Sequence, residues 1–288
     1  MNEKEVEITL KNILGKEAYI IKPLLGGMMN QSYIVSYQDK KYVLYIATKQ
    51  ANEMVDRELE KENQKIIIDL GLTSKNIYFD TKTGTKINEY LEGSSLDKED
   101  SFDTLKVANL LKGVHVSKIL SKEDYHPFNR FLNYEKEAGL YTNDFGDHYQ
   151  ELKDVLINNR EFLESQHKCL CHNDAQKSNI VDSLGHYYII DFEFMANNDP
   201  IYDIAAFGNN KVSEGYEVLN VYFNKKPSLE EKKRYYLWRI FISLQWHNVA
   251  LIKHYRGEGK THGFNFLDVA TFFMNNALEA YQRLLEIK

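Results

Sequence analysis

The chain has 288 residues, of which 43% are hydrophobic and 27% are charged, and its formal net charge is −6. This composition is typical of a globular protein with a core large enough for one large domain or two lobes. The net negative charge and the lack of a dense Lys/Arg block argue against a nucleic-acid partner. Since no stretch approaches the ~18 apolar residues of a membrane span, and the charged N-terminus does not resemble a signal peptide, we expect a cytoplasmic protein without a membrane partner.

The two cysteines, Cys169 and Cys171, are separated by one residue. In an extended stretch this spacing puts both side chains on one face, where neighbouring positions rarely form a disulfide. A metal site would need two further ligands, and none of suitable spacing is obvious. We therefore expect two reduced, buried cysteines, as is usual in the cytosol.

The first 91 residues predict a small sheet with one helix inserted between its strands. Apolar residues at a 3.6-residue period mark two helices, which end at Gly15 and Gly71. Short runs rich in β-branched and aromatic residues mark strands at hairpin-like spacing. The predicted elements are a helix over about 6–14, strands over 18–23, 32–37 and 41–47, a helix over about 52–70, and strands over 77–80 and 85–91.

Beyond Gly93 the pattern becomes mainly helical. Ser228 and Glu231 have the spacing of a capping box, which predicts a helix start. One pair of strands, over 179–182 and 187–191, interrupts the helical part. The predicted helices cover about 102–121, 149–166, 229–255 and 267–286.

These elements predict the α+β class and the outline of a two-lobed, protein-kinase-like fold. Residues 1–91 would form a small β-rich N-lobe with its sheet and helix, and residues 92–288 a larger, mainly helical C-lobe. Periodicity alone does not establish this fold, so the motifs must carry the argument.

A group of polar residues between 172 and 193 has the composition that phosphoryl transfer from Mg-ATP requires. Transfer to a hydroxyl needs a carboxylate near the attacking oxygen, oxygen ligands for Mg²⁺, and positive or N–H-rich groups around the phosphates. Asp174 and Asn179 are five residues apart in a predicted loop, and Asp191 follows the apolar strand that ends at Ile190. We predict that Asp174 is the catalytic base or orients the acceptor hydroxyl, and that Asn179 and Asp191 bind Mg²⁺.

Two neighbouring residues complete this motif. His172 would support the loop by hydrogen bonding, and Glu193 would either reach the metal through water or be structural. A short His-x-Asp or Asp-Phe-x sequence alone occurs often by chance, because Asp and Asn are ordinary turn residues. The whole combination, followed by Asp199-Pro-Ile-Tyr-Asp203, is far more specific.

The pattern resembles the choline/ethanolamine kinase family, within the aminoglycoside-phosphotransferase-like branch of the kinase fold, and in particular the bacterial choline kinases. The resemblance implies an ATP-binding N-lobe, a helical C-lobe that binds substrate, Asp174 as base, and Asn179 and Asp191 as Mg²⁺ ligands. The stretches that carry it run along nearly the whole chain in the expected order: residues 25–33, 56–60, 86–91, 172–179, 189–193 and 198–204.

The nucleotide contacts are predicted from the N-lobe. Gly26 and Gly27 join two strands, so their backbone could approach phosphates without a Cβ clash, although most such pairs are simply hairpin turns. Asn30 lies in the stretch that resembles the family's phosphate loop. We expect a hinge near Glu89 and Leu91, where backbone groups would contact adenine.

One cation expected from the resemblance is missing. The family places Lys or Arg on the third strand where this chain has Tyr45, and the matching helix glutamate, Glu60, then lacks its obvious partner. Lys41 or Lys49 could substitute, or catalysis could be slow or lost.

The acceptor site is less clearly marked. Aromatic faces and a carboxylate commonly hold trimethylammonium groups. The resemblance assigns Phe194 and Trp246 to the acceptor, but the family's second tryptophan falls at Val249. Its carboxylate falls at Asn210, with Glu214 nearby.

The sequence therefore predicts an ATP- and Mg-dependent kinase that phosphorylates a small cationic alcohol, choline first. Ethanolamine, an aminoglycoside or a thiamine-like cation are alternative acceptors. A catalytically weakened nucleotide-binding protein is the alternative from another class. A homodimer is left open.

Overall fold

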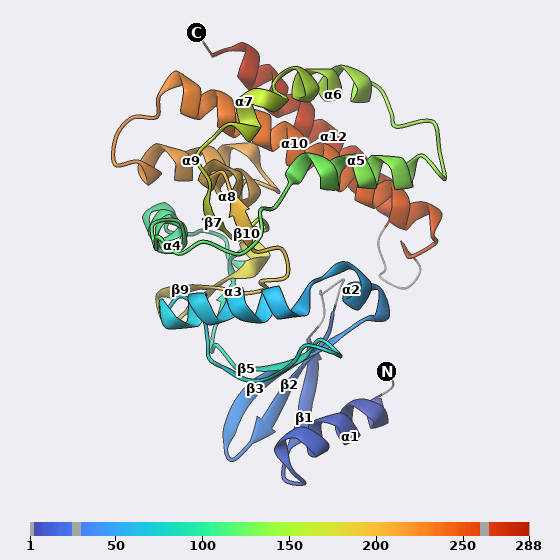
Figure 1. Ribbon diagram of the computed structural model, residues 1–288, viewed down its shortest axis with the longest axis vertical. Coiled ribbons are helices and arrows are strands. Elements are labelled where there is room, and N and C mark those ends of the chain that lie inside the picture. The colour runs from blue at the N-terminus through green and yellow to red at the C-terminus, as the bar shows by residue number, and fades with distance from the viewer. Residues whose placement is uncertain (1–2, 25–29, 260–264, 288) are drawn as a thin grey trace. The chain divides into compact units, whose positions relative to one another are not determined.

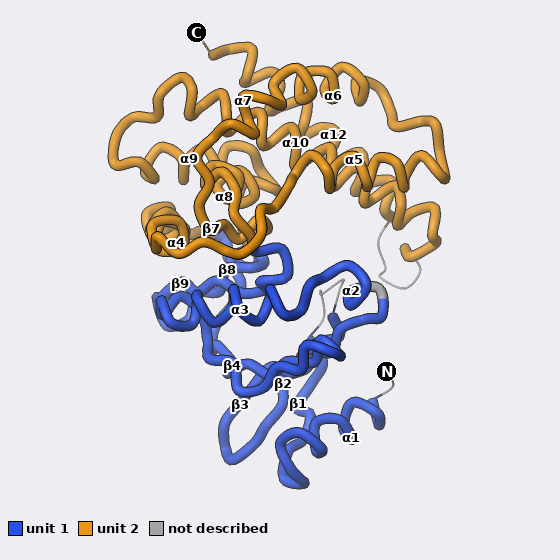
Figure 2. Tube along the Cα trace, viewed as in Figure 1, with its two compact units in different colours: residues 1–100, 178–195 blue, residues 101–177, 196–288 orange. Residues whose placement is uncertain are grey.

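The computed structural model describes residues 3–24, 30–259 and 265–287. The chain folds into two compact units (Figure 2). Unit 1 consists of residues 1–100 and 178–195, and unit 2 of residues 101–177 and 196–288. A β-rich N-terminal part and a helical C-terminal part confirm the predicted α+β, kinase-like class. The roles given to residues 1–91 and 92–288 remain predictions.

Unit 1 is built on a five-stranded antiparallel sheet with the strand order β1-β2-β3-β5-β4 (Figure 1). Tyr37 pairs with Lys40, so the β2–β3 turn has two residues, Gln38 and Asp39, whose φ angles are 50° and 58°. Such left-handed turns match the twist of a hairpin. The strands are β1 (Tyr19–Leu24), β2 (Asn30–Tyr37), β3 (Lys40–Ala47), β4 (Asn76–Asp80) and β5 (Thr85–Glu89).

The helices α1 (Glu3–Leu14) and α3 (Arg57–Asp69) contact opposite faces of this sheet. Val6 and Leu10 of α1 belong to a hydrophobic core with Leu44 and Ile87. On the other face, the side chain of Gln64 in α3 donates to Asn88 of β5. The sheet therefore presents one apolar and one largely polar face, and the polar face carries the residues discussed below.

The single helix predicted over 52–70 is two helices, α2 (Lys49–Met54) and α3. The backbone turns to an extended conformation at Val55, and Asp56 then caps α3 by accepting the N–H groups of Glu58 and Leu59, both at 3.0 Å. An aspartate that caps a new helix satisfies orphan N–H donors, which favours a break over continuation.

Unit 1 also contains a short three-stranded sheet of β6 (Ser94–Ser95), β8 (Ile180–Ser183) and β9 (His186–Ile189), with the 3-10 turn η1 (Leu96–Lys98) after β6. The strands β8 and β9 are the predicted hairpin, with each strand extending one residue further toward the turn and ending one or two residues short at the open end. Their pairing brings the residues on either side of the hairpin close together, since the N–H of Ile190 donates to the carbonyl of Asn179 at 2.9 Å.

Unit 2 is mainly helical. The long helix α10 contacts α12, α8 and α5, and its capping box at Ser228 and Glu231 is present as predicted. The predicted helix over 149–166 is divided in two near Asn159. The elements are α4 (Thr104–His115), α5 (Pro127–Ala138), α6 (Tyr149–Asn158), α7 (Arg160–Glu164), β7 (Cys169–Cys171), the 3-10 turn η2 (Lys177–Asn179) at the boundary with unit 1, β10 (Ala196–Asn198), α8 (Pro200–Phe207), α9 (Val212–Tyr222), α10 (Leu229–Tyr255) and α12 (Phe266–Leu285).

Three of these helices, α5, α8 and α9, were missed from the sequence. The helix α8 shows why, because all its residues after Pro200 are buried and it has no polar face to reveal a 3.6-residue period. Its residues pack with α10 in an aromatic core that includes Tyr202, Trp238 and Phe241.

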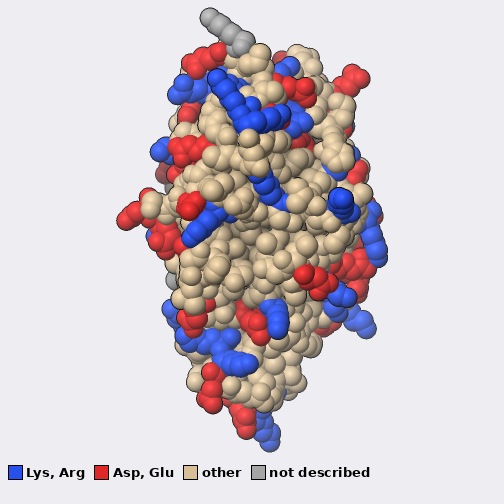
Figure 3. Space-filling model, turned by 90° about the vertical axis from the view of Figure 1, so that its left-hand side faces the viewer, with Lys and Arg blue, Asp and Glu red and all other residues tan. Residues whose placement is uncertain are grey.

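Cys169 and Cys171 are buried and unbridged, with their sulfur atoms 3.8 Å apart, as predicted. Among the described residues, no helix is long and apolar enough to cross a membrane. On the face shown in Figure 3, Lys and Arg side chains alternate with Asp and Glu, without a broad basic patch.

Candidate functional site

A buried ion cluster lies on the polar face of the unit 1 sheet. Pairing of β3 with β5 puts Tyr45 directly opposite Lys86, so both side chains point to the same face. The Lys86 Nζ donates to Oε1 of Glu60 in α3, and Arg57 Nη1 donates to Oε2 of Glu60 at 2.6 Å. Lys86 and Glu60 are each 2% exposed, so one buried carboxylate holds two cations.

Glu60, which lacks its obvious partner at position 45, therefore has cation partners elsewhere in unit 1. Lys86, on the next strand of the sheet, occupies the position that Tyr45 leaves without a charge. Neither suggested substitute does so, since Lys41 donates to Glu92 at the surface at 2.7 Å and Lys49 is exposed on α2. The sequence did not reveal this partner, because β3 and β5 are neighbours in space but about 40 residues apart.

The charges of this cluster persist at neutral pH. Burial acts to lower the pKa of Lys86, but the negative charges of Glu60 and Asp191 outweigh it and raise that pKa above its ordinary value. Burial also raises the pKa of Tyr45 to about 12, which keeps its phenol neutral. The Lys86 ammonium lies 5.1 Å from the centre of the Tyr45 ring, a cation–π distance.

The predicted metal ligands lie at one end of the β8–β9 hairpin. Asn179 ends η2, and Asp191 follows β9 with a left-handed φ of 69°, an uncommon conformation for a residue other than glycine. One Asp191 oxygen, Oδ1, and one Glu193 oxygen, Oε2, are buried and have no hydrogen-bond partner within the described part of the chain. Burial and the charge of Asp191 raise the pKa of Glu193 to about 9. Hard, desolvated carboxylate oxygens of this kind fit a divalent cation such as Mg²⁺.

In unit 2, Asp174 lies in a loop whose backbone is hydrogen-bonded to the side chain of Asp203. The two Asp203 carboxylate oxygens accept the backbone N–H groups of His172 and Asn173, each at 2.7 Å. The N–H of Asp174 lies 3.3 Å from Nδ1 of His172, which confirms the supporting role predicted for His172. Gln176 donates to Oδ2 of Asp174 at 3.1 Å, so the catalytic candidate is held in a fixed orientation.

The sequence analysis assigned no role to Asp203, and the structure gives it one. Its Oδ2 also contacts Nε2 of His115 at 3.0 Å, and Nδ1 of His115 contacts the Tyr222 hydroxyl at 2.7 Å. Potential ligand atoms of His115, Cys171 and Asp203 lie within 4.8 Å of one another. Burial raises the pKa of Cys171 well above its usual value, so the thiol stays protonated, and this cluster serves as a hydrogen-bond support.

The two residues predicted to contact the acceptor, Phe194 and Trp246, lie in different units of the chain. Phe194 is half-buried in unit 1, and Trp246 is half-buried on α10 in unit 2, where it stacks on Phe273 with ring centres 6.3 Å apart. Glu214, the carboxylate near Asn210, pairs with Lys177 at 2.9 Å.

Close to Asp174, the structure adds three residues that the sequence analysis missed. The pKa of Tyr202 is raised by its burial, by Tyr125, and to a smaller degree by the charge of Asp174. The rings of Tyr125 and Tyr202 are 5.4 Å apart, and the Arg130 guanidinium lies 5.1 Å from the centre of the Tyr125 ring. A buried pair of aromatic rings near the catalytic candidate thus already has a protein cation against it. Of the three, only Tyr202 lay in a stretch that resembled the family.

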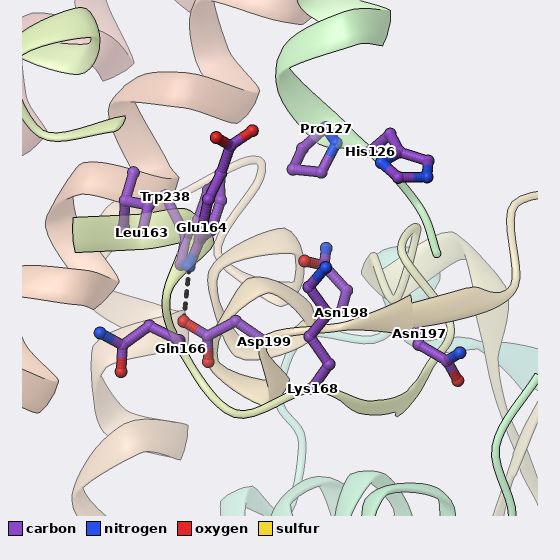
Figure 4. A pocket seen from close by; sticks show the side chains of 10 residues that line it. All are labelled: His126, Pro127, Leu163, Glu164, Gln166, Lys168, Asn197, Asn198, Asp199 and Trp238. Atoms are coloured by element: carbon purple, nitrogen blue, oxygen red, sulfur yellow. Dashed lines mark hydrogen bonds between the residues drawn. The ribbon is translucent and has the colours of Figure 1, made fainter. Parts of the chain in front are cut away.

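A separate pocket of about 280 Å³ lies within unit 2. Figure 4 shows Trp238 beside it, with its indole N–H donating to Asp199 at 2.8 Å. Its lining includes none of the predicted acceptor or metal residues: His126, Pro127, Leu163, Glu164, Gln166, Lys168, Asn197, Asn198, Asp199 and Trp238.

The structure describes some of the other residues that were predicted to contact the nucleotide. Gly26 and Gly27 lie outside the described residues. Asn30 begins β2 and is buried, and its Oδ1 has no hydrogen-bond partner among the residues that the structure describes. Glu89 ends β5, and its N–H already donates to the Lys75 carbonyl at 2.8 Å; Leu91, two residues later, is half-buried.

Comparisons with known proteins agree with this arrangement. A family model described as choline/ethanolamine kinase matches residues 21–239. Protein LicA of Haemophilus influenzae is 25% identical over 280 residues, which cover 91% of this chain and 79% of that protein.

Two solved structures share the fold. The crystal structure of choline kinase LicA from Streptococcus pneumoniae superposes with a TM-score of 0.75 at 24% identity and covers 99% of both chains. A choline/ethanolamine kinase family protein from Mesorhizobium loti gives a TM-score of 0.79 at 18% identity, covering 99% of this chain and 95% of that one.

Proposed function

Because this chain belongs to the choline/ethanolamine kinase family and is therefore a phosphotransferase, we propose that it transfers the γ-phosphoryl group of ATP to the hydroxyl of choline in a Mg²⁺-dependent reaction. The observation that carries the proposal is the Asp174 loop, in which Asp203 holds two backbone N–H groups at 2.7 Å and Gln176 fixes the carboxylate. A loop held this firmly suits a group that must orient a reacting hydroxyl.

Each candidate residue has a distinct task in this reaction. Asp174 accepts a hydrogen bond, and then the proton, from the acceptor hydroxyl. Asn179 and Asp191 would hold Mg²⁺, and the two buried carboxylate oxygens without partners at Asp191 and Glu193 support this assignment. The metal supplies neutralisation of phosphate charge when bound. Asn30 and the backbone of Gly26 and Gly27 would contact phosphate, and the backbone around Glu89 and Leu91 would contact adenine.

Choline is the proposed acceptor because the two solved structures named above are those of a choline kinase and of a choline/ethanolamine kinase family protein. Trp246 and Phe194 remain predicted acceptor contacts, since an aromatic face attracts a quaternary ammonium. The pairing of Glu214 with Lys177 and the guanidinium of Arg130 beside Tyr125 reduce the negative charge available to a cation. Ethanolamine, an aminoglycoside and a thiamine-type cation are therefore kept as alternative acceptors.

An acceptor panel tests the proposal. ADP release by the purified protein with Mg-ATP would be measured for choline, ethanolamine, thiamine and an aminoglycoside, with an acceptor-free reaction as control. We expect the highest kcat/KM with choline. A clear preference for another acceptor would contradict choline but keep the kinase assignment, and ADP release at the acceptor-free rate throughout would contradict both.

We also propose that the enzyme acts in the cytoplasm, because its phosphoryl donor ATP is available there, and the two unbridged cysteines support a reducing compartment. A homodimer remains a prediction, which sedimentation of the purified protein would test.

A further inference from the structure

We propose that Lys86 of β5 contacts the α- and β-phosphates of ATP, and that Glu60 and Arg57 hold it in position. This inference rests on the proposed function, because it assigns a phosphate-binding cation to the same nucleotide site. Its substrate class is a nucleoside di- or triphosphate.

The sheet register carries the first step. The strands β3 and β5 are neighbours in the sheet (Figure 1), and their register makes Tyr45 and Lys86 direct partners. Directly opposite side chains have Cβ atoms about 4.5–5.5 Å apart. A lysine has a flexible four-carbon stem, so an ammonium from either strand can reach the same region above the sheet. The Lys86 ammonium is found there, over the Tyr45 ring and bonded to Glu60 of α3.

The second step comes from the charges. Lys86 and Arg57 share the single carboxylate of Glu60, so two cations lie together in a buried place. Arg57 is 5% exposed, and its Nη2 has no hydrogen-bond partner among the described residues. The charge of Asp191, a proposed metal ligand, also acts on Lys86. A buried cation beside a metal-binding carboxylate suits a polyphosphate that the metal also contacts.

Stability alone gives a poor reason for this cluster. Removing charges from water is costly, and replacing a buried ion pair by apolar residues of similar volume is often neutral or stabilising. If Lys86, Glu60 and Arg57 served only to join α3 to β5, loss of Lys86 would weaken folding. It would not lower the affinity for ATP and ADP more than the affinity for adenosine, which has no phosphate. This difference makes the proposal testable.

Binding of ATP, ADP and adenosine would be measured by calorimetry without Mg²⁺, using the full-length protein and its Lys86→Met variant. We expect ATP and ADP to bind on the order of tenfold more weakly to the variant, because a charge-assisted contact is lost, while adenosine binds within about twofold of wild type. The exposed lysines serve as matched controls, and Lys41→Met and Lys49→Met should bind all three ligands as wild type does.

A second variant tests the position of the ammonium. Tyr45→Lys combined with Lys86→Met returns a lysine to the opposite strand, and we expect ATP affinity to recover to within a few-fold of wild type. If Lys86→Met fails to fold by circular dichroism, the double variant takes its place: recovered ATP affinity, or a loss confined to ATP and ADP, supports the proposal, and an equal loss for ATP and adenosine overturns it.

Two further outcomes also overturn it. One is unchanged ATP affinity in a folded Lys86→Met protein, and the other is an equal loss for ATP and adenosine. Failure of the proposed function would look different, because the wild-type protein itself would neither bind ATP nor release ADP with any acceptor.

Discussion

Replacing Asp203 by asparagine should both destabilise the protein and slow the reaction. The fully buried carboxylate accepts the N–H groups of His172 and Asn173 at 2.7 Å and contacts Nε2 of His115 at 3.0 Å. Hydrogen bonds to a charged acceptor contribute about 1.5–3 kcal/mol each. Asparagine keeps one acceptor oxygen, but its amide nitrogen faces a donor, so one bond is lost and one buried N–H is left without a partner. We expect a loss of about 3–5 kcal/mol in the free energy of unfolding.

Urea denaturation followed by circular dichroism measures this loss, and steady-state ADP release measures the effect on the loop. Because misplacing a catalytic group by about 1 Å can cost on the order of 100-fold in rate, kcat should fall by a similar factor. Asp56→Asn is the matched control, since Asp56 also accepts two backbone N–H groups but is exposed, and asparagine caps a helix as well as aspartate. An Asp203→Asn loss below about 1 kcal/mol, or a full kcat, would refute the reasoning.

Two further predictions concern the helices of unit 2. Burial lowers the pKa of His247 below its ordinary 6.5, so the unfolded chain binds more protons than the folded one below that pH, and the free energy of unfolding should fall as the pH falls. His247→Gln should reduce this fall between pH 7 and 5 in urea titrations. An unchanged fall in the variant would contradict the reasoning. Trp246→Ala should raise KM for choline about tenfold without changing KM for ATP, whereas Trp246→Phe should retain most of the affinity for choline. Equal kinetics of the wild type and both variants would exclude Trp246 from the acceptor site.

The sequence predicted best those features that lie close together along the chain. Asp174, Asn179 and Asp191 fall within 18 residues, and the hairpin between the last two follows from local strand and turn signals. The capping box that starts α10 is equally local. Such features depend on spacing that a reader of the sequence can see.

Features that depend on distant pairing were not predictable in this way. In the sequence, Lys86 looks like any polar residue of an amphipathic strand. Only the β3–β5 register shows that it lies opposite Tyr45, where its ammonium donates to Glu60. The same holds for Tyr125 and Tyr202, which are far apart in the sequence but have ring centres 5.4 Å apart in unit 2. A resemblance located the missing cation at Tyr45, but only the fold could show which residue replaces it.

The central claim, that this chain transfers phosphate with Asp174 acting on the acceptor hydroxyl, is tested most directly by Asp174→Asn. Phosphorylated acceptor would be quantified by ³¹P NMR alongside ADP for wild type and variant, with ATP affinity measured separately and the exposed Asp154→Asn as control. We predict equal amounts of both products from wild type and a rate lower by roughly 10²–10⁴-fold in the variant, with ATP binding retained. Full turnover by a folded Asp174→Asn protein would contradict the account.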